Sequence, residues 1–181
     1  MSKPSLVIVI AEDGQHRMLV SRYLKKRGME QHAIRAFVSP AGQGSAENWV
    51  RKKFVRETSI YRSRHAQTAL IVVIDADTRT VQDRLGQLDQ ALKDNGKRAV
   101  DSDTEQIARL VTKRNIETWI LCLNEHAVDE ETDYKNNDDW SKLIARSAET
   151  LFQWTRSGAE PPAYCVASLR SGIKEPHHLK F

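Results

Sequence analysis

Acidic residues that directly follow two hydrophobic segments are the side chains of this sequence best suited to chemistry. Glu12 and Asp13 follow the first long apolar run, and Asp75 and Asp77 follow the second. Asp75 and Asp77 are two positions apart, so in an extended chain their side chains would leave the same face about 6 to 7 Å apart. Together with Glu12 or Asp13 they would supply three or four oxygen ligands for Mg²⁺ or Mn²⁺, cations that keep other positions for water and a substrate phosphate.

The same acids have a simpler explanation in the local preferences of turns. Aspartate is common where a strand ends, and Asp77 or Thr78 would serve as the N-cap of a following helix. Several carboxylates packed together without a cation would, however, raise one another's pKa. We therefore expect a bound metal if the two strand ends meet in one crevice.

Unbroken runs of aliphatic residues predict strands that are buried on both faces of a mainly parallel sheet. The segments that fit strands are 6–10, 32–39, 69–74 and 107–111. Apolar residues at helical spacing predict helices over 15–27, 49–65, 81–92, 116–123 and 141–154. This alternation indicates an α/β fold, a three-layer sandwich with a mostly parallel central sheet. In such sheets the functional crevice lies beyond the carboxyl ends of the strands, where the four acids would gather.

The composition of the 181-residue chain is that of one folded domain. It is 40% hydrophobic and 29% charged, which is enough apolar material for one core and too much for a disordered chain. We expect a single domain over 1–181, with a core over 5–125 and a helical extension over 138–181. The two cysteines have no zinc-binding spacing and favour a reducing, cytoplasmic environment. The apolar runs are too short to cross a bilayer, so no membrane anchoring is expected.

A basic segment with interleaved aromatic residues is the second feature suited to binding. Its cations are Arg51, Lys52, Lys53, Arg56, Arg62 and Arg64. They would attract a phosphate backbone, and Trp49, Phe54 and Tyr61 would either stack on exposed bases or face the core. The chain has a net charge of +4 although its predicted crevice is acidic, a distribution expected of a metal-dependent enzyme that acts on a polyanion. The segment therefore predicts binding of DNA or RNA.

These motifs resemble the Toprim domain of topoisomerases, primases and the overcoming-lysogenisation-defect nucleases. The resemblance rests on a hydrophobic strand that ends in glutamate, here 7–12, and on a later strand that ends in Asp-x-Asp, here 71–77. The segment 114–121, Arg-Asn-Ile-Glu-Thr-Trp-Ile-Leu, further resembles small stand-alone Toprim-like proteins, many of them associated with bacterial mobile-element or phage-defence loci. The resemblance covers residues 5–125 and implies a Toprim-like, Rossmann-like fold.

The resemblance implies a role for each matching side chain. Glu12 corresponds to the general acid/base of the family, and Asp75 and Asp77 correspond to its metal ligands. The implied activity is cleavage or transfer of phosphodiester bonds, in which Mg²⁺ stabilises charge on the phosphate and activates water. Glu117 would be an additional acid near the site, or else a solvent-facing residue of its helix. Lys174 matches the late lysine with which such nucleases steady phosphate charge, or else is a surface residue.

One position departs from the stand-alone relatives, which often carry Glu-Gly-x-x-Glu at the first turn. The chain has Glu-Asp-Gly-Gln-His over 12–16, so His16 stands where the second acid would be. This departure favours a second interpretation, a Toprim-shaped module without activity that binds nucleic acid or a partner protein such as an ATPase. A third interpretation is a response-regulator receiver in which Asp75 would accept a phosphoryl group. No P-loop, dinucleotide fingerprint, nucleophile elbow or zinc-protease motif occurs.

Overall fold

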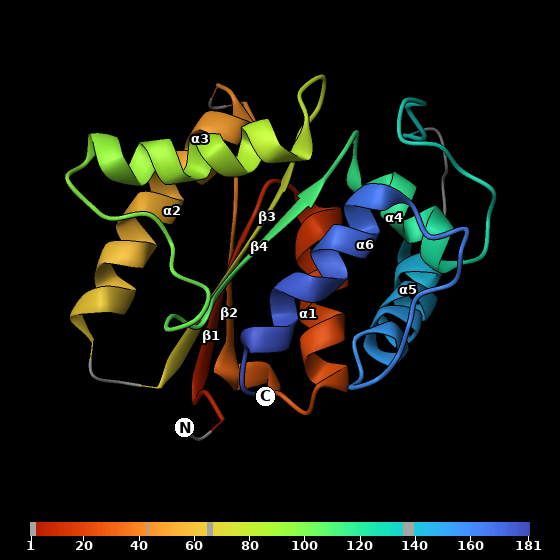
Figure 1. The fold of residues 1–181 in the computed structure, drawn as a ribbon, viewed down its shortest axis with the longest axis horizontal. Coiled ribbons are helices and arrows are strands. Elements are labelled where there is room, and N and C mark those ends of the chain that lie inside the picture. Colours follow the sequence, from red (N-terminus) through yellow and green to blue (C-terminus); the bar gives the residue numbers. More distant parts are fainter. Residues whose placement is uncertain (1–2, 43, 65–66, 136–139) are drawn as a thin grey trace.

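In the computed structural model of the protein, four parallel strands form the centre of the fold (Figure 1). The structure describes residues 3–42, 44–64, 67–135 and 140–181. The strands are β1 (Leu6–Ala11), β2 (Ile34–Val38), β3 (Thr68–Asp75) and β4 (Ile107–Thr112). β3 is buried along its whole length, which explains why its sequence is continuously apolar and does not alternate.

Helices cover both faces of the sheet, as Figure 1 shows. One face carries α2 (Ala46–Ser63) and α3 (Val81–Asp94). The other face carries α1 (Gly14–Lys26), α4 (Ile116–Leu123), α5 (Trp140–Trp154) and α6 (Ala167–Lys174). Alternate residues of β1 point to opposite faces of the sheet. Val7 and Val9 pack in the hydrophobic cluster with α1, and Ile8 and Ile10 pack in the cluster with α2. The predicted three-layer α/β sandwich is therefore confirmed.

The strand order places the ends of the predicted acidic segments next to each other. The strands lie in the order β2-β1-β3-β4, so β1 and β3 are neighbours although α1, β2 and α2 separate them in the sequence. The register pairs Ala11 with Val73, and Asp75 with Thr112. Because all strands are parallel, these carboxyl ends lie at one edge of the sheet.

The last part of the predicted helical extension forms α6 and a short 3-10 helix, η2 (Glu175–His178). This pair covers the free edge of β4, because the backbone N–H of Arg109 donates to Oε2 of Glu175 at 2.8 Å. α6 also packs closely on α4: the indole N–H of Trp119 donates to Ser168 at 2.7 Å, and a Cβ atom on Gly172 would overlap the Trp119 ring. The predicted extension thus shares one hydrophobic cluster with the sheet.

Element boundaries differ from the sequence prediction where capping side chains decide them. α2 begins at Ala46, before the predicted start at Trp49, because the Ser45 hydroxyl accepts the N–H of Asn48 at 3.3 Å. A 3-10 turn, η1 (Gln31–Ala33), takes up the start of the predicted second strand. Residue 65, at the end of the predicted basic helix, and residues 138–139 of the predicted extension lie outside the described residues.

Candidate functional site

The carboxyl ends of β1 and β3 bring Glu12 and Asp75 into direct contact. The backbone N–H of Asp75 donates a hydrogen bond to Oε2 of Glu12 at 2.9 Å, and the N–H of Glu12 donates to the carbonyl of Val73 at 3.3 Å. His16, in the first turn of α1, completes a group in which one ligand atom each of Glu12, His16 and Asp75 lie within 4.8 Å of one another. These three residues, here termed the Glu–His–Asp cluster, can hold a metal ion.

His16 is fully buried and bridges two carboxylates. Its Nδ1 atom lies 2.8 Å from Oδ1 of Asp13, the N-cap of α1, and its Nε2 atom lies 2.9 Å from Oδ1 of Asp75. Burial lowers the pKa of His16, but the charges and hydrogen bonds of Asp75 and Asp13 outweigh it and raise that pKa well above its ordinary value. Burial likewise raises the pKa of Asp13, but hydrogen bonds from His16 and its charge lower it to about 2. Both ring nitrogens face carboxylate oxygens, which only accept hydrogen bonds, so this geometry favours the imidazolium, the form that donates from both nitrogens.

One acid of the cluster and one acid beside it have pKa values above their ordinary range. Burial, reinforced by the charge of Asp75, raises the pKa of Glu12 to about 7. Glu117 lies in the first turn of α4 and is only 5% exposed. Burial and the charges of Asp75 and Asp13 also raise the pKa of Glu117. Glu117 is thus a buried acid within the electrostatic reach of the cluster, and the solvent-facing alternative does not hold.

The prediction that Asp75 and Asp77 leave the same face of an extended chain is wrong. β3 ends at Asp75, and Asp77 adopts the left-handed conformation with φ 55°. The chain therefore changes direction between them, so a spacing of two residues no longer places both side chains on one face. The Asp77 side chain is 53% exposed, and its Oδ2 atom lies 3.3 Å from Nη2 of Arg84. The helix cap is Thr80 and not Asp77 or Thr78.

Arg84 connects the end of β3 to α2 and is only 3% exposed. Its Nε donates to the carbonyl of Asp75 at 2.8 Å, and its Nη1 lies 2.7 Å from Oε1 of Glu47. Glu47 also pairs with Arg51 one turn along α2. Since a buried guanidinium must satisfy its donors within the protein, Arg84 fixes both the carbonyl of Asp75 and the carboxylate of Asp77.

The oxygen atoms of the cluster suit a hard divalent cation. Oδ1 of Asp75 accepts hydrogen bonds from His16 and Thr112, and Oε2 of Glu12 accepts the N–H of Asp75. Oδ2 of Asp75 and Oε1 of Glu12 make no hydrogen bond with any part of the chain that the structure describes. Carboxylate oxygens are the preferred ligands of Mg²⁺ and Mn²⁺, so Glu12 and Asp75 fit such an ion. His16 would become a ligand only after releasing a carboxylate, because both of its nitrogens are engaged.

Three of the six predicted nucleic-acid-binding cations are paired with acids of the protein itself. Arg62 lies 2.7 Å from Glu105, which is 4% exposed, and Lys53 lies 2.8 Å from Glu57. Arg51 belongs to the chain of ion pairs described above. The other three cations are exposed and form no ion pair with the described residues: Lys52, Arg56 and Arg64.

The aromatic residues of the basic segment face the core. Phe54 is completely buried, and Trp49 packs against the cluster on the same face of the sheet. The hydroxyl of Tyr61 accepts the backbone N–H of Gln106 at 2.8 Å. Of the two predicted roles for these rings, stacking on nucleic-acid bases is therefore wrong and packing in the core is confirmed.

Lys174 lies away from the Glu–His–Asp cluster. It is exposed at the C-terminal end of α6, which runs from α4 back toward the start of β4 (Figure 1). The following 3-10 helix ends beside the first residue of β4, where Nε2 of His178 lies 2.9 Å from the carbonyl of Ile107. Lys174 therefore lies toward the amino edge of the sheet, where it lines a separate cavity of about 340 Å³.

Two residues that the sequence did not single out shape the site. The hydroxyl of Thr112 donates to Oδ1 of Asp75. The sequence contains a sign of this role, because Thr112 is a polar residue at the end of an apolar strand. Arg84 shares a helical face with the buried Leu88, four positions later. An arginine within the apolar stripe of a helix indicates a buried charge with a partner, and that partner is Glu47.

No family model, curated protein or solved structure matches the chain. Within the ranges that the structure describes, no helix is both long and apolar enough to cross a membrane. Fold and site together define an α/β protein with a parallel four-stranded sheet and, at its carboxyl edge, a buried Glu–His–Asp cluster that can hold a metal ion.

Proposed function

We propose that the protein is a Toprim-like phosphodiesterase that cleaves DNA or RNA with Mg²⁺ or Mn²⁺, in the phage-defence or mobile-element context that the resemblance implies. The observation that carries the proposal is the contact between Glu12 and Asp75, whose carboxylates converge from separate strands. Each of them keeps one oxygen free of protein hydrogen bonds with the described residues. Such a pair at the carboxyl edge of a parallel sheet is a suitable site for a divalent ion and a substrate phosphate.

The residues around this pair suit proton transfer at a phosphate. Glu12, with a pKa of about 7, populates both protonation states near neutral pH and is able to accept and return a proton. Asp75 would hold the metal, with Asp77 and Asp13 at the rim of the site. When bound, the metal would supply charge stabilisation on the phosphate and a more acidic water. Glu117 would add negative charge that favours cation binding.

A second candidate function is supported by His16. Its imidazolium lies between Asp13 and Asp75 and supplies positive charge where the family pattern has a second acid. A cluster that is neutralised by its own histidine needs no metal to be stable. The protein would then be a Toprim-shaped module that binds nucleic acid, or a partner such as an ATPase, without cutting.

The test compares cleavage of supercoiled plasmid, linear duplex and single-stranded DNA and RNA with Mg²⁺, Mn²⁺ or EDTA. We expect metal-dependent cleavage that falls by about 100-fold or more in Glu12→Gln, the range of a lost general acid/base, and that is abolished in Asp75→Asn. Glu30→Gln, at an exposed position, is the matched control and keeps full activity.

Three outcomes would overturn parts of this proposal. Cleavage that survives Asp75→Asn rejects the Glu–His–Asp cluster as the reacting centre. Binding of nucleic acid without cleavage, with a steep salt dependence, would support the inactive module. Transfer of phosphate from acetyl phosphate to Asp75 would support the receiver. Mn²⁺ binding is followed by electron paramagnetic resonance in the wild type and in Asp75→Asn, and circular dichroism of the same samples shows whether a loss of binding reflects a loss of the fold.

A further inference from the structure

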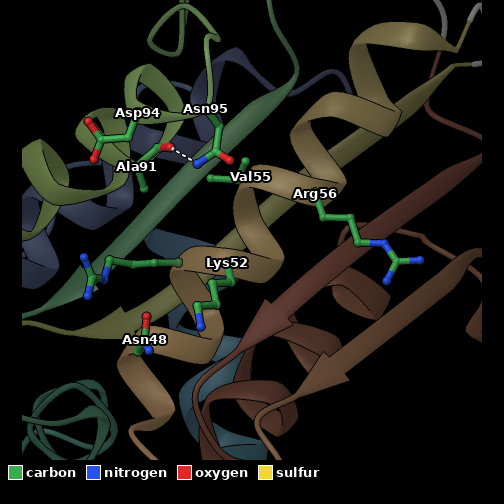
Figure 2. Close-up of a pocket in the computed structure, with 8 residues that line it drawn as sticks. Asn48, Lys52, Val55, Arg56, Ala91, Asp94 and Asn95 are labelled. Atoms are coloured by element: carbon green, nitrogen blue, oxygen red, sulfur yellow. Dashed lines mark hydrogen bonds between the residues drawn. The ribbon is translucent and has the colours of Figure 1, made fainter.

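A cavity of about 460 Å³ opens between α2 and α3, on the face of the sheet opposite α1 (Figure 2). Three cations of α2 line it at helical spacing, Arg51, Lys52 and Arg56. The carboxamides of Asn48 and Asn95 lie on its two walls. The volume is in the range of sites that hold a nucleotide-sized ligand. We term this cavity the α2–α3 groove.

The positive charge of the α2–α3 groove is available to a ligand. Lys52 and Arg56 are exposed and form no ion pair among the residues that the structure describes. Asp94 is the acid that lines the groove, and its Oδ1 accepts a hydrogen bond from Gln90 at 2.6 Å. The cations outnumber the acid, and amide groups accompany them, so the chemistry of the groove selects a phosphate-bearing ligand.

The groove is connected to the Glu–His–Asp cluster through a short chain of ion pairs, of which Arg84 is the buried member. Arg51, on the wall of the groove, pairs with Glu47, and Glu47 lies 2.7 Å from Arg84. Arg84 in turn donates to the carbonyl of Asp75 at 2.8 Å and contacts Asp77. Only the side chains of Glu47 and Arg84 separate Arg51 on the groove wall from Asp75, so the groove lies close to the candidate reacting centre.

We propose that the α2–α3 groove binds phosphates of a single-stranded nucleic acid and leads that strand to the Glu–His–Asp cluster. The proposal rests on the proposed function for the identity of the cluster as the reacting centre. A single strand fits better than a duplex because a cavity of about 460 Å³ admits individual nucleotides, whereas a duplex would touch only the rim. Binding depends on the cations and on the apolar surface of Val55 and Ala91, since the aromatic rings of α2 are in the core.

The test measures fluorescence anisotropy of labelled single-stranded DNA and RNA of about 12 nucleotides, in EDTA so that no cleavage occurs. The variant Lys52→Gln/Arg56→Gln removes the two unpaired cations of the groove. The control Lys25→Gln/Arg35→Gln removes two exposed cations elsewhere, from α1 and β2, and changes the net charge equally. The groove variant is expected to bind about tenfold more weakly, and the slope of log affinity against log salt should fall by about 1.4, or 0.7 for each lost contact. The control is expected to stay within about twofold.

Several results would overturn the groove assignment. Equal losses in the two double variants would show that only net charge matters. If duplex bound as tightly as single strand, the preference for a single strand would be rejected. If a nucleoside monophosphate competed as well as the oligonucleotide, the groove would be a nucleotide site and not a site for a strand. The same experiments test the groove and the proposed function separately.

If the wild type binds through the groove but does not cut with Mg²⁺, the nuclease is rejected and the groove assignment stands. If it cuts but its binding does not depend on the groove, the groove assignment is rejected and the nuclease stands.

Discussion

The Nε2 atom of His16 lies 2.9 Å from Oδ1 of Asp75, and both side chains are buried. The same ring donates to Asp13 through Nδ1 at 2.8 Å. The histidine thus acts as an internal counter-ion for two acids from separate elements, the N-cap of α1 and the end of β3. This relationship links the turn after β1 to the end of β3 and places a positive charge beside the carboxylates of Glu12 and Asp75.

Replacing His16 by glutamine should destabilise the protein and increase the stabilisation that it gains from divalent ions. Loss of the imidazolium leaves Asp75 without its charged partner, which costs about 3 kcal/mol of unfolding free energy. Mg²⁺ at about 100 times its dissociation constant should restore about 2.7 kcal/mol. Urea unfolding with and without Mg²⁺ measures both effects. His32→Gln, at an exposed histidine, should change neither, and a His16→Gln variant as stable as the wild type would remove the counter-ion role.

Arg84 should couple energetically to Glu47. Arg84→Met removes the buried partner of Glu47, Asp77 and the carbonyl of Asp75. It is expected to lower the unfolding free energy by about 1 to 3 kcal/mol. Glu47→Gln removes the other half of the same ion pair, so the double variant should be about 1 to 3 kcal/mol more stable than the sum of the single changes predicts. A double-mutant cycle in urea measures this coupling. Arg79→Gln, at an exposed arginine, provides the baseline, and strictly additive effects would contradict the network.

Glu105 should stabilise the protein only above its folded-state pKa. Burial raises the pKa of Glu105, but hydrogen bonds and charge from Arg62 bring it below the ordinary value of 4.5. Its contribution is therefore complete above that ordinary value and is lost as the pH falls through the lower folded value. Glu105→Gln should lose about 2 kcal/mol near neutral pH.

The difference between wild type and Glu105→Gln should shrink toward zero in acid. Urea unfolding followed by circular dichroism from about pH 7 to about pH 3 covers this window. Asp103→Asn, at an exposed residue of the same loop, should leave the pH profile unchanged. A stability difference that stays constant down to the acid end would rule out the ionised Glu105 as its source.

Alanine at two helical glycines should have opposite effects. A Cβ atom on Gly172 would overlap the buried ring of Trp119, so Gly172→Ala is expected to destabilise by about 1 to 3 kcal/mol. Gly86 is an exposed position of α3 with open space where a Cβ would lie. Gly86→Ala should therefore stabilise by about 0.5 to 1 kcal/mol. Thermal and urea unfolding of the two variants test the packing of α6 on α4, and a stable Gly172→Ala protein would show that α6 does not approach Trp119 closely.

The sequence by itself determined the layers of this protein. Continuous apolar runs such as 69–74 occur only where both faces of a strand are covered, so they specify a parallel sheet between helices. The positions of Glu12 and Asp75 at strand ends also followed from the sequence, because parallel strands bring their carboxyl ends to one edge. Periodicity and strand direction are local properties, and they are sufficient for these conclusions.

Only the tertiary structure decided which side chains meet. The left-handed backbone at Asp77 turns it toward Arg84, and the burial of Glu117 and His16 depends on how α4 and α1 pack against the sheet. Arg62 and Lys174 also have neighbours that no local pattern specifies, since a cation is a ligand-binding residue or an internal partner according to what lies opposite it. The pairing of charges is a long-range property of the fold. It distinguishes the cations of α2 that are exposed and unpaired among the described residues from those that form ion pairs within the protein.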